Sequence, residues 1–325
     1  MQRRRLGGLE VAAIGLGCAT MTPFYDEPDE EAAIDTLRRS REIGVDFLDS
    51  SNAYGRGRNE ELIARAIRGH RNEHIIATKF GNLRAADGSP TSDGRPEYVK
   101  ACCERSLKRL ETDVIDLYYI HRVDPTVPIE DTVGAMSNLV REGKVRHLGI
   151  CEAGAATIRR AHAIHPLSAV QIEYSLWTRD VEAEILPLCE ELGIGFVAYS
   201  PLGRGFLAGN VMDVTRLRAG DARRNMPRFH ADNVAHNLVL VDKLKELAAV
   251  EKRTPAQLAL AWVLSRAPYI VPIPGTSHRH RLEENAAAES LNISADTEEA
   301  LLQVFPPDAA SGLRYPENHL KRLGI

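Results

Sequence analysis

Short apolar runs alternate with stretches of helical periodicity along almost the whole chain. Each run is rich in β-branched or other apolar residues, and a polar turn and a helix-like pattern follow it. These runs predict strands at residues 13–17, 46–49, 74–79, 114–120, 145–150, 168–172, 194–199 and 269–273. The helical pattern predicts helices near residues 29–43, 59–68, 97–110, 130–141, 154–164, 181–191, 234–266 and 278–289. Pro255 is expected to divide the seventh helix, because the first turn of a helix tolerates proline and the interior does not.

Eight strand–helix units in one chain indicate a parallel sheet covered by helices. Such a sheet is either open and doubly wound or closed into a barrel. The length of 325 residues and the absence of a break in composition favour the barrel. We therefore predict an α/β fold, a (β/α)8 TIM barrel that forms a single domain over residues 1–325. Residues 1–11 are expected to form a short β-hairpin that closes its bottom, and the long loops 81–95 and 203–232 to rise from its C-terminal mouth.

The composition is that of an ordinary globular protein, with 44% hydrophobic and 26% charged residues. The net charge of −4 gives no electrostatic reason to expect a nucleic acid or an anionic membrane as partner. No stretch is apolar enough to span a bilayer, and the basic start of the chain is not followed by the apolar region of a signal peptide. The odd number of cysteines, without metal-like spacing, predicts free thiols, no metal site and a cytoplasmic location. They are Cys18, Cys102, Cys103, Cys151 and Cys189.

Candidate chemistry lies where three successive predicted strands end. Asp49 ends the second strand, with Tyr54 in the loop after it, Lys79 ends the third, and His121 follows the fourth. Consecutive strands of a barrel are neighbours, so these four side chains are expected to converge on one rim. Taken singly, Asp49 could be a turn-former, Tyr54 a surface aromatic and His121 a satisfied core histidine. Lys79 is harder to explain in this way, because an unpaired buried lysine would be costly. Together they predict a catalytic site.

This set of residues suits the reduction of a carbonyl group by hydride, which leaves an alkoxide-like oxygen that needs a proton. Tyr54 can donate it, but a phenol has an ordinary pKa of about 10, and burial raises that pKa further. We expect Lys79 to lower the pKa by two to three units, roughly 3–4 kcal/mol, which one cation at about 4 Å can supply. Asp49 would keep that lysine charged, and His121 would orient the carbonyl oxygen.

Over essentially its whole length the sequence resembles the aldo-keto reductase superfamily. Its branch nearest to this chain contains the bacterial and plant-type reductases related to the potassium-channel β-subunits. The resemblance implies that Tyr54 is the proton donor, that Lys79 and Asp49 tune it, and that His121 positions the substrate. It is carried by residues 15–18 (GLGC), 49–55 (DSSNAYG), 77–79 (ATK), 119–125 (YIHRVDP) and 141–150 (REGKVRHLGI).

The resemblance also implies a nicotinamide cofactor held without a Rossmann fold, in agreement with the lack of a GxGxxG segment that opens a helix. Gln171 would bind the carboxamide, and Tyr199 would stack on the nicotinamide ring. The cofactor-binding residues that it implies are Cys18, Asp49, Cys151, Gln171, Tyr199, Ser200, Leu202, Gly205, Gly275, Thr276, Ser277, Arg281, Glu284 and Asn285.

The predicted helix after the eighth strand carries the choice between NADPH and NADH. Its N-terminal amides would meet an anion, and Arg281, helped by His278 or Arg279, could hold a 2′-phosphate. NADPH is therefore the expected cofactor, and NADH is less favoured. The alternative is that residues 278–281 are only the solvated start of a helix.

Several positions depart from the pattern of the family. Cys151 stands where a serine is usual and Glu152 where many members have asparagine. Asn210 and Ser277 occupy positions that are basic in other members. These departures affect cofactor affinity and the preference for NADPH, and they leave the four catalytic candidates in place.

The loop 203–232 is rich in arginine and is either a clasp over the cofactor or an acidic substrate, or a solvated, mobile loop. Trp177, Phe24 and Tyr25 are candidates for an apolar substrate wall. The arginines are Arg204, Arg216, Arg218, Arg223, Arg224 and Arg228.

Three functions fit these observations to different degrees. The first is a reductase acting on a small-molecule carbonyl compound. The second is a cofactor-binding regulatory subunit with slow turnover, against which His121 argues because the related channel subunits have asparagine there. The third, a metal-dependent barrel hydrolase, needs clustered histidines and carboxylates at strand ends, and only His121 and Asp49 offer themselves. The sequence does not predict the substrate, which could be an aromatic aldehyde, a sugar, a pyridoxal-like compound or a polyketide ketone. It does not predict the oligomeric state either.

Overall fold

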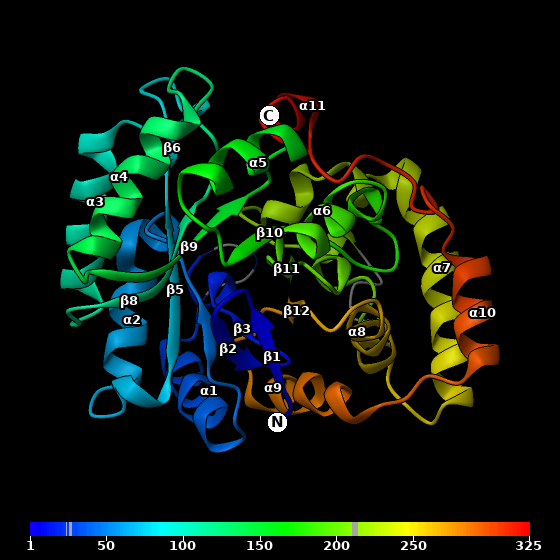
Figure 1. The fold of residues 1–325 in the computed structure, drawn as a ribbon. Coiled ribbons are helices and arrows are strands. Elements are labelled where there is room, and N and C mark those ends of the chain that lie inside the picture. The colour runs from blue at the N-terminus through cyan, green and yellow to red at the C-terminus, as the bar shows by residue number, and fades with distance from the viewer. Residues whose placement is uncertain (24, 26–27, 210–213) are drawn as a thin grey trace.

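The computed structural model describes residues 1–23, 25, 28–209 and 214–325 (Figure 1). Phe24 and Asn210, to which roles were assigned from the sequence, lie outside the described residues. The central sheet has eight strands in the order β12-β11-β10-β9-β8-β5-β4-β3, and all of its pairings are parallel. They are β3 (Leu16–Gly17), β4 (Phe47–Asp49), β5 (Ile75–Phe80), β8 (Ile115–Ile120), β9 (Val145–Cys151), β10 (Ala169–Glu173), β11 (Gly195–Tyr199) and β12 (Ile270–Ile273). Each of the eight predicted strands is present.

The sheet closes on itself where its first and last strands meet. The backbone amide of Gly15 donates to the carbonyl oxygen of Pro272 at 3.0 Å, and the amide of Gly17 donates to that of Pro274 at 3.2 Å. A Cβ atom on Gly17 would lie 2.7 Å from the carbonyl oxygen of Ile273, so only glycine allows this close approach. The closure excludes an open sheet and confirms the predicted (β/α)8 barrel.

Helices surround the barrel, as Figure 1 shows. They are α1 (Glu30–Glu42), α2 (Arg58–Ala66), α3 (Pro96–Arg109), α4 (Ile129–Arg141), α5 (Ala155–Ile164), α6 (Ile185–Leu192), α7 (Ala231–Val250), α8 (Pro255–Ser265), α9 (Arg279–Ala286), α10 (Ala295–Val304) and α11 (Glu317–Leu320). The predicted division at Pro255 is confirmed, because Thr254 and Gln257 form a capping box that starts α8 there. The last two helices were not predicted. Within the described part of the chain, no helix is long and apolar enough to cross a membrane.

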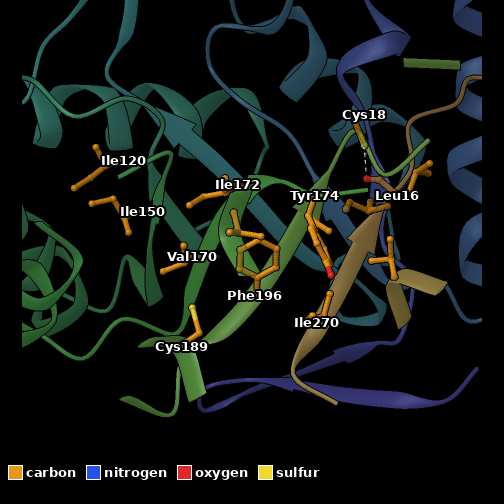
Figure 2. Close-up of a cluster of buried hydrophobic side chains, with 14 of the residues drawn as sticks. Leu16, Cys18, Ile120, Ile150, Val170, Ile172, Tyr174, Cys189, Phe196 and Ile270 are labelled. Atoms are coloured by element: carbon orange, nitrogen blue, oxygen red, sulfur yellow. Dashed lines mark hydrogen bonds between the residues drawn. The ribbon is translucent and has the colours of Figure 1, made fainter. Parts of the chain in front are cut away.

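Apolar side chains fill both sides of the barrel wall. Outside it, side chains from the strands pack under the helices in one large cluster, part of which Figure 2 draws around Phe196 and Tyr174. Inside it, Phe47, Leu117 and Val197 pack with residues of the antiparallel hairpin formed by β1 (Arg3–Leu6) and β2 (Leu9–Ala12). The hairpin predicted for residues 1–11 therefore plugs the bottom of the barrel.

Three segments build the opposite end, where the strands terminate. The loop 81–95 contains a small hairpin that was not predicted, made of β6 (Asn82–Arg84) and β7 (Pro90–Ser92). The described part of the loop 203–232 is a series of short 3-10 turns. Residues 305–325, which we call the C-terminal segment, include α11 and attach beside β9, because the amide of Gly324 donates to the carbonyl oxygen of Glu152 at 2.8 Å.

Candidate active site

A cavity of about 1150 Å³ opens at the carboxyl ends of the barrel strands. Asp49, Tyr54 and His121 line it at one part of its wall, and Arg281 and Asn285 of α9 line it at another. The hairpin β6–β7 and the C-terminal segment contribute further wall residues. The cavity therefore joins the predicted catalytic residues to the predicted end of the cofactor site.

Lys79 is the buried charge of this site. It lies on β5 beside Asp49 of β4, has no exposed surface, and donates both to the Asp49 carboxylate and to the carbonyl oxygen of Ser50, the latter at 2.7 Å. Burial opposes the charged amine, but Asp49, Tyr54 and Cys151 together outweigh it, and the pKa of Lys79 is raised above its ordinary value. The other oxygen of Asp49 accepts from the Gln171 side chain at 2.8 Å. The ammonium group thus stays charged and fixed.

Tyr54 begins a short 3-10 turn (Tyr54–Gly57) that follows β4. The amine of Lys79 lies 5.4 Å from the centre of its ring, and the His121 ring meets it edge-on at 5.8 Å between centroids. All four predicted catalytic residues are therefore brought together. Burial raises the pKa of Tyr54 to about 12, because it outweighs the lowering by Lys79, to which Asp49 is also opposed. This corrects the expectation of a phenol with a lowered pKa.

His121 is a buried, neutral group. Its Nδ1 lies 3.0 Å from the hydroxyl oxygen of Ser51. Burial, followed by the positive charges of Arg122 and Lys79, lowers its pKa well below the ordinary value. A neutral imidazole has one N–H donor, so at neutral pH the ring can donate a single hydrogen bond through one of its nitrogens.

Most of the predicted cofactor-binding residues share the cavity wall. Cys18 and Cys151 do not reach it: both are fully buried, and burial raises the pKa of the Cys151 thiol to about 12. The residues that line the cavity are Asp49, Gln171, Tyr199, Ser200, Leu202, Gly205, Gly275, Thr276, Ser277, Arg281, Glu284 and Asn285.

The two arginines near the start of α9 differ in their partners. Arg279 forms ion pairs with Glu283 at 3.3 Å and with Asp35 at 3.8 Å. Arg281 lines the cavity and has no acidic partner within the residues that the structure describes. No side chain caps the helix, so its first-turn amides lack the usual side-chain acceptor. Of the two arginines, Arg281 is the one whose charge is left for a ligand.

Glu152 holds the C-terminal segment in place, a role that sequence reasoning missed. Its two carboxylate oxygens accept from Arg314 at 2.7 and 2.8 Å, and one also accepts from the Tyr199 hydroxyl at 2.7 Å. Burial would raise the pKa of Glu152, but the hydrogen bonds and charge of Arg314, the charge of Arg122 and the Tyr199 hydrogen bond together outweigh it, and the pKa is lowered. Tyr315 joins through a 3.1 Å contact with the Tyr199 hydroxyl. The sequence marked Glu152 only as a departure, and nothing in it pointed to an arginine so distant along the chain.

Several arginines of the loop 203–232 are bound within the protein. Arg204 pairs with Glu173 at 3.1 Å, and Arg223 pairs with Asp221 at 2.7 Å. Arg228 donates to the Thr178 hydroxyl at 2.6 Å and to the backbone of Trp177. These contacts hold the three arginines within the protein and correct the interpretation of those arginines as solvated.

The two apolar candidates among the described residues lie differently. Tyr25 lines the main cavity. Trp177 is 2% exposed, packs on Phe206 and does not line that cavity, which corrects its proposed place in a substrate wall.

The fold and the site define a (β/α)8-barrel protein with a small-molecule cavity at the carboxyl ends of its strands. Residues 13–304 match the model of the Aldo/keto reductase family, and the chain belongs to that family of oxidoreductases.

Individual relatives agree with this assignment along most of the chain. A curated protein of Glycine max, probable aldo-keto reductase 1, is 46% identical over 310 residues, which are 95% of this chain and 89% of that protein. Among solved structures, the glycerol dehydrogenase of Gluconobacter oxydans is similar with a TM-score of 0.85 and 26% identity, over 93% of this chain and 94% of that one. An aldo-keto reductase of Klebsiella pneumoniae, solved in complex with NADPH, has a TM-score of 0.74 and 26% identity over 100% of both chains.

Proposed function

We propose that this protein is an NADPH-dependent reductase that converts an aldehyde or a ketone into an alcohol, with Tyr54 as the proton donor. One observation carries the proposal: the buried ammonium group of Lys79 lies 5.4 Å from the Tyr54 ring, at a cavity that His121 also lines. The related reductase solved with NADPH supports the choice of cofactor.

The cavity suits a long, anionic dinucleotide. It reaches from Tyr54 to the uncapped start of α9, where Arg281 has no acidic partner among the described residues. A helix N-terminus and an arginine are groups that bind phosphate. In this proposal Arg281 holds the 2′-phosphate, Thr276 and Ser277 lie along the phosphates, and Gln171 and Tyr199 hold the nicotinamide. The cofactor, when bound, supplies the hydride.

The residues of the chain handle the proton. With a pKa of about 12, Tyr54 is protonated at neutral pH and is ready to donate. The nascent alkoxide is a stronger base, with a conjugate acid whose pKa is roughly 16, as for water, so the transfer runs downhill. Lys79 stabilises the phenolate that remains, and Asp49 holds Lys79. The neutral ring of His121 donates a hydrogen bond that orients the carbonyl oxygen.

Consumption of NADPH with a panel of aldehydes and ketones, followed by the absorbance of the reduced nicotinamide, tests the proposal. We expect steady turnover, and a higher KM for NADH, since that cofactor gives Arg281 no phosphate to bind. Tight binding of NADPH without turnover of any carbonyl compound would contradict the proposal and favour a cofactor-binding regulatory subunit.

A further inference from the structure

Positive charges gather around His121 at the cavity wall. Arg122 follows it directly after β8, Arg84 ends β6, and Arg322 belongs to the C-terminal segment, which also brings the ring of His319 to this wall. These groups lie close enough to act on one another: burial, and after it the charges of Arg322, Arg84 and Arg122, lowers the pKa of His319. Three different segments of the chain thus bring cations to one part of the cavity.

The three arginines of this group are bonded only to neutral oxygens. Arg122 donates to the carbonyl of His121 at 2.6 Å, and Arg84 donates to that of Gly88 at 3.0 Å. Arg322 donates to the carbonyl of Thr91 at 2.7 Å and to the hydroxyl of Ser92 at 2.9 Å. Across the described ranges of the chain, none of the three has a carboxylate partner.

Other arginines of the same cavity wall are compensated. Arg109 pairs with Glu60 at 2.6 Å, in the same way as Arg204 and Arg223 pair with their acidic partners. The nearby carboxylate of Glu152 acts on Arg122, but both of its oxygens are already bound by Arg314. Arg281, at the start of α9, is also without an acidic partner among the described residues, and in the function proposed above it binds the cofactor. Arg122, Arg84 and Arg322 are thus a second uncompensated group, at the part of the wall that holds His121.

Arg122 and Arg322 are half-buried and Arg84 is exposed, and half-buried guanidinium groups without a counter-ion favour an anionic ligand. Each guanidinium carries five N–H donors, and Arg122 uses one of its donors within the protein. The planar groups that fit such donors are carboxylate and phosphate. A cavity lined by one sign of charge also concentrates ligands of the opposite sign.

We propose that the carbonyl substrate of this protein carries an anionic group, a carboxylate or a phosphate, that Arg122 and Arg322 bind beside His121. The reduction of that substrate rests on the function proposed above, whereas the binding of the anion does not. The charges of both arginines act on the His121 ring, so we expect the anionic group and the carbonyl to be separated by a short chain of a few carbon atoms. Small oxo-acids and phosphorylated aldehydes have this form.

Paired substrates that differ only in the charged group test the proposal. Succinic semialdehyde is compared with its methyl ester, and glyceraldehyde 3-phosphate with glyceraldehyde. We expect kcat/KM for at least one charged member to exceed that of its neutral partner by about tenfold or more, since charge-assisted hydrogen bonds are the strong ones. The pair with the larger ratio distinguishes carboxylate from phosphate.

Variants then assign the preference to the two arginines. Arg122→Gln and Arg322→Gln are each expected to lower the ratio about tenfold, mainly through KM of the charged substrate. Arg122→Lys should retain part of it, because lysine keeps the charge but loses the bidentate geometry. Arg68→Gln is the control, since Arg68 follows α2, pairs with the exposed Glu111 and does not line the cavity. It should leave both rates unchanged.

Calorimetric titration separates this inference from the proposed function. Succinate and glycerol 3-phosphate are the probes, succinamide and glycerol their neutral controls, and Arg122→Gln is expected to weaken binding about tenfold. Binding of the anions without reduction of any aldehyde would overturn only the proposed function. Reduction of neutral aldehydes, with no preference for charge and no binding of either anion, would overturn the inference. If Arg122→Gln fails to fold, an unchanged ratio in Arg322→Gln decides against it.

Discussion

The two ends of the barrel are built from the same strands but held by opposite kinds of contact. At the bottom, Leu6 of the N-terminal hairpin packs among apolar side chains such as Phe47 and Leu117. At the mouth, buried charges are paired, with Lys79 on Asp49 and further pairs of the loops and the C-terminal segment. Along each strand the two environments are two residues apart, because side chains that point to the same face recur at every second residue. The inward-facing pairs are Phe47 and Asp49, Ala77 and Lys79, Ala169 and Gln171, and Val197 and Tyr199.

This contrast teaches how the barrel divides stability from chemistry. When a substitution shortens an apolar side chain at the bottom, the free energy of unfolding falls in proportion to the volume removed. A buried ion pair behaves differently, because removal of one partner leaves an uncompensated charge, whereas replacement of both by apolar groups can be harmless. Single substitutions at the two ends should therefore have different signatures.

The largest effect is expected at the centre of the mouth. Lys79→Met leaves Asp49 buried with Gln171 as its side-chain donor, and should lower the free energy of unfolding by about 3–5 kcal/mol. Urea denaturation followed by circular dichroism measures this. The double variant Lys79→Met, Asp49→Leu should recover most of the loss while remaining inactive. A cost below about 1 kcal/mol for the single change would mean that the pair is not the buried charge network described here.

A substitution at the bottom should cost stability alone. Leu6→Ala removes a fully buried side chain and should lower the free energy of unfolding by about 3 kcal/mol, within the usual range for such cavities. Turnover of the folded enzyme at low temperature is expected to stay within about twofold, since Leu6 does not line the cavity. A large fall in kcat would show that the two ends are coupled.

At the mouth, removal of one oxygen should cost turnover alone. Tyr54→Phe is expected to retain NADPH binding and lose at least about a hundredfold in kcat, equivalent to about 2.7 kcal/mol of activation free energy. Steady-state kinetics and fluorescence titration with NADPH measure the two effects. Tyr269→Phe, whose hydroxyl donates to the backbone of Leu186 outside the cavity, is the matched control. Retained activity in Tyr54→Phe would move the proton donor elsewhere.

A smaller effect is expected where the C-terminal segment is attached. Glu152→Gln keeps the shape but removes the charge that Arg314 binds, and should cost about 1–2 kcal/mol and expose residues 305–325 to protease. Limited proteolysis and denaturation measure both. Glu191→Gln breaks an exposed pair with Arg159 and should change neither. Equal behaviour of the two variants would argue against the anchoring role of Glu152.

The smallest effect is that of pH on reduction. The pKa of Tyr54 is raised to about 12, that of Lys79 is raised, and that of His121 is lowered well below its ordinary value. All three groups therefore keep one protonation state between about pH 7 and 9, and the rate of reduction should be flat there. Oxidation of the alcohol needs the phenolate and should rise about tenfold per pH unit. An inflection in the reduction rate within this range would contradict these assignments.

The sequence predicts the barrel well because its signals are local. The short apolar runs mark all eight strands, Pro255 marks the start of α8, and the first residues form the expected hairpin. The hairpin β6–β7 escapes because its short strands carry no apolar alternation. The helices α10 and α11 also escape, in the polar and proline-containing stretch that follows the last strand–helix unit.

The sequence predicts which residues form the candidate site better than it predicts their pKa values and ion pairs. Residue order brings Asp49, Tyr54, Lys79 and His121 to one rim, and the structure unites them. The raised pKa of Tyr54 could not be predicted, because it depends on how completely the folded protein excludes water. The same holds for Glu152 and Arg314, whose pairing is decided by the path of the C-terminal segment across the mouth.

The glycines that close the barrel also make a seam between β3 and β12 that has no continuous ladder. Opposite Gly15 the residue in position to return a bond is Pro274, which has no N–H, and Gly17 forms an isolated bridge with Gly275. Hydrogen exchange should therefore be faster at the amides of Gly15 and Gly17 than along β8, where the wall is continuous. Thermal fluctuations would then separate β3 from β12 first, beside Gly275 of the cavity wall, so that the barrel opens next to the pocket that receives the ligand.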